Sequence, residues 1–240
     1  MKTAIILSGA MRSFERCLPN LQWHVFRHFH DAKFYVATAN DEDATTAAML
    51  GKRCAAVRVL DQPEMVLPPG CPHEWTPGKP YMHEPYFISV DPRHVLGQLW
   101  MLREGWRLYQ EANEPAELII RCRPDLWFHS FEMPHGIGKF GPDQMVAFTS
   151  WWGRFSGVND RFALLGPKAA EAYFTTYDHV PLMVMEGAPL HPETLVHYSM
   201  KRAGISICDD MKAEFSTLRK SGEMRPPEIT TIDLAHFGKG

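Results

Sequence analysis

Short apolar runs alternate with stretches of helical periodicity along most of this chain, and that alternation restricts its fold more than any other feature. Thr3–Leu7, Lys33–Thr38 and Ala55–Leu60 are predicted strands, because each is a short apolar or β-branched run. Between them, Asn20–Phe29 carries an apolar residue at every fourth position, and Asp41–Leu50 is predicted as a helix capped by its first residue and ended by the next glycine. This order predicts a parallel sheet with right-handed crossovers.

The same alternation continues beyond residue 92. The clearest helical stripe is His94–Gln110, whose apolar residues step by three and four positions along one face. Further strands are predicted at Glu117–Cys122, Gln144–Thr149, Asp160–Leu165 and Ile205–Cys208, and further helices at Lys168–Tyr177 and Glu193–Ala203. The predicted fold class is therefore α/β, with a mostly parallel central sheet flanked by helices.

Length and composition suit a single domain over residues 1–240, since 45% of the residues are hydrophobic and no linker interrupts the pattern. Residues 61–92 are rich in proline and aromatic side chains and are predicted to form an ordered excursion over one side of a cleft. Residues 209–240 alternate charge, proline and glycine, so a peripheral tail is expected there.

Charge and cysteine usage exclude several classes of protein. The net charge is −3 with no basic stripe, so duplex nucleic acid is not expected as the main partner. The five cysteines are scattered and form no C-x-x-C pair, which favours reduced thiols in a cytoplasmic protein over a zinc site or disulfide framework. No apolar stretch is long enough for a transmembrane segment.

The segment Glu117–Phe128, ELIIRCRPDLWF, is the most informative for function. Its apolar run ends in Arg121, Arg123, Pro124 and Asp125, and the proline stops the strand because it has no N–H to donate. Ligands bind at the carboxyl ends of strands in open α/β sheets. Arginine beside a carboxylate suits a phosphate-bearing substrate, with or without a divalent cation. The alternative is an internal Arg–Asp ion pair that caps the strand.

Two more loops are expected at the same edge of the sheet. Gly9 allows close backbone approach to a ligand and Arg12 can clamp a phosphate, although a loop of this kind is more often a plain turn with a surface arginine. This loop lacks the G-x-G-x-x-G and G-K-[ST] patterns of dinucleotide and P-loop sites. Asp41, after the second strand, is better explained as a helix cap than as a ribose ligand.

The candidates for the acceptor side lie later in the chain. Trp151 and Trp152 stand beside a glycine and suit a platform for a sugar ring. Asp160 can take a proton from an acceptor hydroxyl, or can be a satisfied turn residue. His191 and Glu193 begin a helix, where they either bind substrate or only cap the helix and complement its dipole.

Four motifs in order, AIILSGAMRSFERC, IIRCRPDLWF, GVNDRFALLGP and HPETLVHYSMKRAGI, resemble bacterial and viral glycosyltransferases of the GT-A type. The resemblance implies a single GT-A-like Rossmann-type domain. Such a domain moves a sugar from a nucleotide diphosphate donor to a hydroxyl acceptor, here a glycan, a lipid-linked oligosaccharide or a modified nucleobase. Carried over to this sequence, Asp125 stands in the acidic metal-binding motif, Gly9 and Arg12 in the nucleotide loop, and Asp160 on the acceptor side.

The chain departs from that group at the acidic motif, where Arg123-Pro124-Asp125 replaces Asp-x-Asp. Either Asp125 alone holds the metal, or arginine neutralises the leaving diphosphate without one. Any Mn²⁺ or Mg²⁺ is expected to bind only together with the nucleotide. His236 and Lys239 are similar to a His and a Lys that some of these enzymes bring to the diphosphate. The alternatives are a nucleotidyltransferase or a non-catalytic nucleotide- or sugar-binding module.

Overall fold

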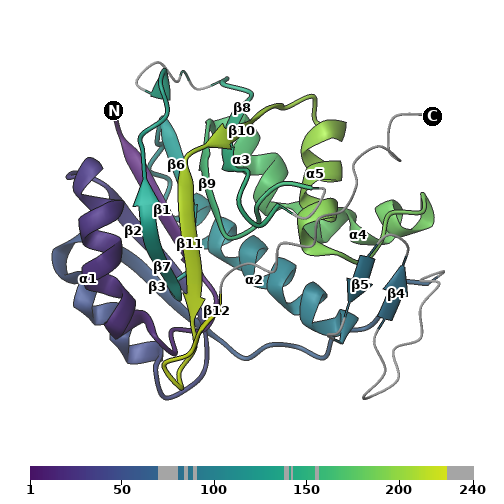
Figure 1. Cartoon of the computed structure of the whole chain (residues 1–240), viewed down its shortest axis with the longest axis horizontal. Coiled ribbons are helices and arrows are strands. Elements are labelled where there is room, and N and C mark those ends of the chain that lie inside the picture. The colour runs from purple at the N-terminus through teal and green to yellow at the C-terminus, as the bar shows by residue number, and fades with distance from the viewer. Residues whose placement is uncertain are drawn as a thin grey trace.

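A seven-stranded sheet forms the centre of the protein, in the order β10-β8-β9-β6-β1-β2-β3 (Figure 1). The structure, a computed structural model, describes residues 1–69, 81–83, 86–88, 91–137, 141, 143–154 and 157–225. The strands are β1 (Thr3–Ser8), β2 (Lys33–Ala39), β3 (Cys54–Leu60), β6 (Leu118–Cys122), β8 (Val146–Ser150), β9 (Phe162–Leu165) and β10 (Ser206–Met211). Only β9 runs against its neighbours, β6 and β8. The predicted α/β class with a mostly parallel sheet is confirmed.

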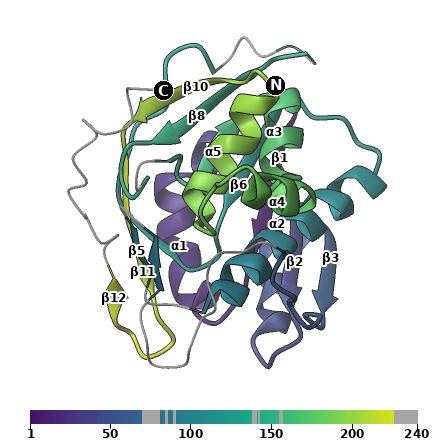
Figure 2. The same cartoon turned by 90° about the vertical axis from the view of Figure 1, so that its right-hand side faces the viewer.

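Helices cover both faces of this sheet (Figures 1 and 2). One face carries α2 (Pro92–Glu111), α3 (Pro167–Phe174), α4 (Thr176–Met185) and α5 (Pro192–Arg202). The other carries α1 (Phe14–His24) and η1 (Phe26–His28), together with a second sheet of β7 (Leu126–Phe131), β11 (Ala213–Leu218) and β12 (Met224–Arg225). The remaining elements are η2 (Ala44–Arg53), β4 (Tyr81–His83) and β5 (Tyr86–Ile88).

Side chains alternate between two hydrophobic cores because successive strand residues point to opposite faces. In β1, Ala4 and Ile6 belong to the core under α2, whereas Ile5 and Leu7 belong to the core under α1. A strand with both faces covered is apolar throughout, as the N-terminal run predicted. No helix in the described part of the chain is both long and apolar enough to cross a membrane.

Several predicted helices have different limits in the structure. The helix expected at Asn20–Phe29 begins earlier, at Phe14, and ends at His24, after which the chain continues as η1. The segment Asp41–Leu50 contains a 3₁₀ helix that starts at Ala44, and Asp41 accepts a hydrogen bond from the Asp43 N–H instead of capping an α-helix. The helix predicted at Lys168–Tyr177 is two helices, α3 and α4.

Residues 209–225 are not the peripheral tail that the sequence led us to expect. They contain the end of β10 and all of β11, and Ala213 and Phe215 are fully buried. Strand β11 pairs with β7, which the sequence analysis missed. Residues 226–240 lie outside the described residues, as do 70–80, 84–85 and 89–90 of the predicted 61–92 excursion.

Candidate functional site

A cavity of about 670 Å³ opens where β1, β2 and β6 end. This is the carboxyl edge of the sheet, where ligands of α/β proteins bind. Its lining includes residues from the loop after β1, the turn after β6, the helix α2 and the hairpin of β11 and β12: Gly9, Arg12, Arg123, Asp125, Gln98, Arg219, Lys220 and Arg225. The structure thus brings together all four residues predicted for the nucleotide end of the site.

Gly9 shapes the first wall of the cavity. Its φ of 131° is one that L side chains rarely adopt, and its N–H donates to the carbonyl of Ala37 at 3.1 Å. A Cβ on Gly9 would lie 3.6 Å from the Cδ atom of Pro124. The loop after β1 therefore folds against the end of β6, which places Arg12 beside the same cavity.

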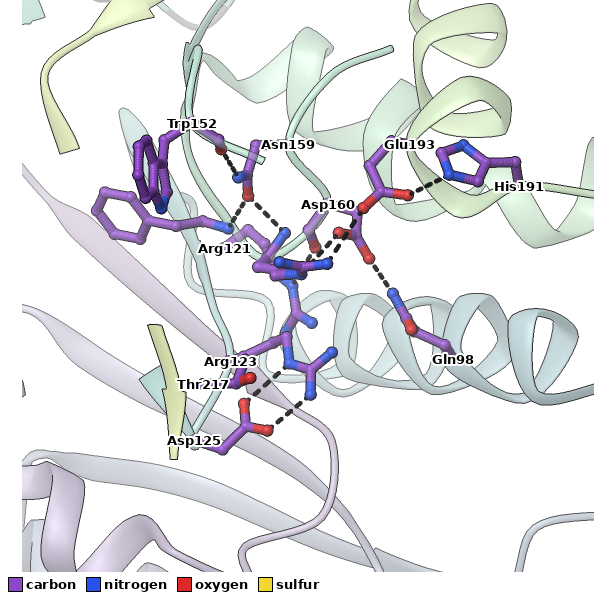
Figure 3. A network of polar contacts seen from close by, with 12 residues as sticks. Gln98, Arg121, Arg123, Asp125, Trp152, Asn159, Asp160, His191, Glu193 and Thr217 are labelled. Carbon is purple, nitrogen blue, oxygen red and sulfur yellow. Dashed lines mark hydrogen bonds and ion pairs between the residues drawn. The ribbon is translucent and has the colours of Figure 1, made fainter. Parts of the chain in front are cut away.

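Arg123 and Asp125 form a two-pronged ion pair at the end of β6 (Figure 3). Arg123 Nε donates to Asp125 Oδ1 at 2.9 Å, and Nη2 donates to Oδ2 at 2.7 Å. Burial alone would raise the pKa of the Asp125 carboxyl, but the charge and hydrogen bonds of Arg123 outweigh it and lower that pKa. The structure thus contains the internal Arg–Asp ion pair that the sequence analysis gave as its alternative. This pair lies at the cavity wall.

By themselves, the described residues form no complete site for a divalent cation. Both oxygens of Asp125 already accept hydrogen bonds from Arg123, and a metal needs them as ligands. The described part of the chain also holds no group of three or more His, Cys, Asp or Glu side chains arranged to bind a metal. His236 and Lys239 lie outside the described residues.

Cationic side chains surround the cavity. Besides Arg121, which donates to backbone oxygens and the Ser8 hydroxyl, two of them have no carboxylate partner among the described residues. These are Arg12, on the loop after β1, and Arg219, on the hairpin after β11. By contrast, Lys220 is paired with Glu42 and Asp43, and Arg225 with Glu223. Partial burial lowers the pKa of Arg219, and the Asp125 charge opposes that shift. Arginine side chains stay protonated in proteins, so the positive charge around the cavity favours binding of an anion.

Arg121 lies beneath the cavity and has a structural part in building it. Its side chain is 1% exposed, and Nη1 donates to the carbonyl and hydroxyl oxygens of Ser8 at 2.9 and 2.7 Å. Nε donates to the backbone carbonyl of Asp160 at 3.2 Å. Arg121 therefore ties the ends of β1, β6 and the loop before β9 to one another.

A second polar cluster lies behind the cavity wall, between the loop before β9 and the start of α5 (Figure 3). Asp160 and Glu193 are both almost completely buried. Arg161 bridges them, with Nε 3.6 Å from Asp160 Oδ1 and Nη2 3.4 Å from Glu193 Oε1. His191 Nε2 lies 3.4 Å from Glu193 Oε2. Asp160 also accepts a hydrogen bond from Gln98 of α2, which connects this cluster to the cavity.

Burial controls the protonation of this cluster. It raises the pKa of Glu193 well above the usual value, and the neighbouring Asp160 carboxylate raises it further. Burial also lowers the pKa of His191 to about 4, so that His191 is neutral at pH 7. Of the two carboxyl groups, Glu193 is therefore the one that burial drives toward its protonated form.

The loop before Asp160 is organised by Asn159 (Figure 3). Asn159 Oδ1 accepts hydrogen bonds from the N–H groups of Arg161 and Phe162 at 2.9 and 3.0 Å, and Nδ2 donates to the Trp152 carbonyl at 2.6 Å. The indole N–H of Trp152 donates to the Phe215 carbonyl at 2.9 Å, whereas Trp151 is 46% exposed. Neither tryptophan is among the described residues that line the cavity.

The predicted site residues therefore fall into three groups. Gly9, Arg12, Arg123 and Asp125 line the cavity. The acceptor-side candidates Asp160, His191 and Glu193 form the cluster behind its wall, and Trp151 and Trp152 lie outside the cavity lining. Sequence reasoning missed Gln98 and Arg219. Gln98 sits within a strongly apolar helical stripe and Arg219 in the segment taken for a tail, so no local pattern marked either residue.

The chain matches no family profile and no curated protein sequence. Among solved structures, it is similar to one titled as a crystal structural analysis of an active-site mutant of LgtC, with a TM-score of 0.40 and 11% sequence identity. The overlap covers 87% of this chain and 72% of the other chain. A likeness of this size carries no argument about activity or substrate.

Proposed function

We propose that this protein is a glycosyltransferase that moves a sugar from a nucleotide diphosphate donor to a hydroxyl acceptor. The observation that carries the proposal is the cavity at the carboxyl edge of the sheet, with Arg12 and Arg219 on two of its walls and no carboxylate partner for either in the described chain. Two guanidinium groups that converge from separate loops suit the oxygens of a diphosphate.

The sugar in this proposal is supported by the order of the sequence motifs that resemble GT-A enzymes. Three of these motifs meet in space, because the loops at Gly9 and Arg123 line the cavity and Asp160 contacts a cavity residue, Gln98. Their convergence is what an active site assembled from distant segments requires. In the proposed reaction, Arg12 and Arg219 would bind the diphosphate and stabilise the negative charge that grows on it as the glycosidic bond breaks.

A non-catalytic nucleotide- or sugar-binding module is the second candidate, and one observation favours it. The two carboxylates predicted to take part in catalysis already have partners in the structure. Asp125 accepts hydrogen bonds from Arg123, and Asp160 accepts one from Gln98 and forms an ion pair with Arg161. An acid–base group must reach the proton it transfers, and Asp160 is only 1% exposed. A binding module needs neither carboxylate to be free.

Binding followed by turnover separates these candidates. The protein is titrated by calorimetry with UDP, GDP, ADP and CMP, and then incubated with UDP-glucose, UDP-galactose and GDP-mannose while release of nucleoside diphosphate is followed. Arg12→Ala and Arg219→Ala should each weaken nucleoside diphosphate binding by about tenfold, as expected for loss of one charge-assisted hydrogen bond of ~1.5 kcal/mol.

Arg202→Ala is the matched control, because Arg202 pairs with Glu186 on the surface of α5 and does not line the cavity. It should leave nucleotide binding unchanged. Slow sugar release by the wild type, lost in Arg219→Ala, supports a transferase. Tight binding with no sugar release from any donor supports the binding module, and pyrophosphate release from a nucleoside triphosphate would support a nucleotidyltransferase. If the protein binds none of these nucleotides, the proposed function is wrong.

A further inference from the structure

Gln98 connects the cavity to the buried acidic cluster. It projects from α2, lines the cavity, and directs its side-chain nitrogen at Asp160, 62 residues further along the chain (Figure 3). The amide presents its NH₂ group to a carboxyl oxygen of Asp160, which accepts the hydrogen bond. The contact with Asp160 therefore sets the orientation of this amide.

The other polar atom of the Gln98 side-chain amide is its carbonyl oxygen. Figure 3 shows this oxygen pointing away from Asp160. Within the described chain it accepts no hydrogen bond, although the residue lines the cavity. A carbonyl oxygen is an acceptor and cannot donate, so the group that it binds on a ligand must carry a hydrogen, as a hydroxyl does.

Glu193 lies in the same buried cluster as Asp160, because Arg161 is near both carboxyl groups. Asp160 Oδ1 is buried and accepts no hydrogen bond from the described residues. Arg161 Nε lies 3.6 Å away, which is too far for a hydrogen bond. Because Arg161 is near both carboxyl groups, a proton on Glu193 would supply the missing donor. Burial and the Asp160 charge both raise the Glu193 pKa in that direction. A buried acceptor left without a donor is costly, so the pair is stable when it shares one proton.

We propose that Glu193, Asp160 and Gln98 form a hydrogen-bond relay that fixes the Gln98 amide with its carbonyl oxygen toward the cavity, where it selects a hydroxyl of the bound ligand. This proposal rests on the proposed function, since the hydroxyl would belong to the sugar or ribose of a nucleotide sugar. Gln98 is then the residue that contacts the ligand, and Asp160 and Glu193 are positioning residues that act through it.

The relay can be tested in the ligand-free protein by the exchange of the Gln98 side-chain amide protons with water. These resonances are assigned in ¹⁵N-glutamine-labelled protein by their loss in Gln98→Met. Slow exchange is expected in the wild type. Glu193→Gln keeps a neutral donor beside Asp160 and should preserve slow exchange, whereas Glu193→Met removes the donor at similar volume and should accelerate it. Equal exchange in both variants would overturn the relay.

The hydroxyl contact is tested with donor analogues of UDP-glucose, UDP-galactose and GDP-mannose in which single hydroxyls are replaced by fluorine, which cannot donate. For the wild type, fluorine at one position should weaken binding about fivefold, the size of one neutral hydrogen bond. In Gln98→Met and Glu193→Met that ratio should fall to about one, and in Glu193→Gln it should persist. Gln62→Met, at another amide that lines the same cavity, should leave the ratio as in the wild type.

The outcomes separate this inference from the proposed function. If the nucleotide sugars bind and no hydroxyl shows a fluorine effect that depends on Gln98, the inference is wrong and the proposed function stands. If none of the nucleotide sugars binds, the proposed function and the hydroxyl contact both fall, while slow exchange in the ligand-free protein would still support the relay itself.

Discussion

Arg123 donates two hydrogen bonds, of 2.9 and 2.7 Å, to the carboxylate of Asp125, although only Pro124 separates the two residues in the chain. Both side chains are largely shielded from water, with 23% and 14% of their surfaces exposed. The pair therefore belongs to the framework of the cavity as well as to its lining. Its double role makes it the most direct place to test the donor end of the site.

Asp125→Asn should remove the charge that Arg123 requires and lower the free energy of unfolding by about 3 kcal/mol. Sugar transfer should fall to background, because Arg123 loses the partner that orients it. Urea unfolding and a donor-turnover assay measure the two effects. Asp178→Asn is the control: the Asp178 side chain is 41% exposed in its pair with Arg103, so its loss should cost less than about 1 kcal/mol. Transfer at near wild-type rate in Asp125→Asn would exclude Asp125 from the donor site.

Metal binding should be undetectable in the nucleotide-free protein, because Arg123 occupies both oxygens of Asp125. Any Mn²⁺ or Mg²⁺ is expected to bind only together with nucleotide phosphates, which would supply the missing oxygen ligands. Calorimetric titration of Mn²⁺ with and without UDP or GDP tests both statements. Micromolar affinity for Mn²⁺ in the absence of nucleotide would show that ligands beyond those described here complete a metal site.

Trp151 and Trp152 should respond differently to truncation. Trp151 is 46% exposed, so Trp151→Ala should barely change stability and, if this ring supports the acceptor, should raise the KM for acceptor more than for donor. Trp152 donates to the Phe215 carbonyl, so Trp152→Ala should destabilise the protein by about 3 kcal/mol. Thermal melts and steady-state kinetics separate the two. Equal effects of Trp151→Ala on both KM values would argue against an acceptor platform.

Glu193 should make stability depend on pH. Burial first, and then the Asp160 charge, raise its pKa in the folded protein above the unfolded value of 4.5. Its contribution is therefore complete below about pH 4.5 and is lost as the pH rises through the folded pKa. Glu193→Gln cannot ionise, so its free energy of unfolding should match the wild type in acid and exceed it increasingly toward alkaline pH.

Unfolding in urea between pH 4.5 and 9 gives this difference directly. His191 acts in the opposite direction, because its pKa is lowered to about 4 and protonation destabilises the fold as the pH falls below about 6.5. Because His191 is present in both proteins, comparing the variant with the wild type at each pH removes the contribution of His191. A difference that stays constant across the range would mean that Glu193 is ionised throughout.

Gly157 should tolerate no side chain. A Cβ at this position would lie 2.2 Å from the backbone oxygen of Glu193, because the loop before β9 packs directly on the start of α5. Gly157→Ala must separate these segments, and overpacking of this kind costs about 1–3 kcal/mol. Gly141→Ala, with open space around its Cβ position, should leave the melting temperature nearly unchanged. Melting temperatures that are equal for the two variants would contradict this packing.

Local sequence determined the central sheet and four of the residues that line the cavity at its edge. The apolar runs at Thr3–Leu7, Lys33–Thr38 and Glu117–Cys122 are confirmed as β1, β2 and β6, because strands covered on both faces must be apolar throughout. Parallel strands also end at a common edge, so Gly9, Arg12, Arg123 and Asp125 had to meet there once the order of elements was known.

Only the tertiary structure decided how the acidic residues are used and how the end of the chain folds. Asp160 and Glu193 are 33 positions apart, and their closeness depends on the bare backbone of Gly157. The pairing of β11 with β7 and of Gln98 with Asp160 likewise joins distant segments, and such contacts leave no periodicity in either segment. Residue types and local spacing determine which elements form, whereas burial and shared protons depend on which elements pack together.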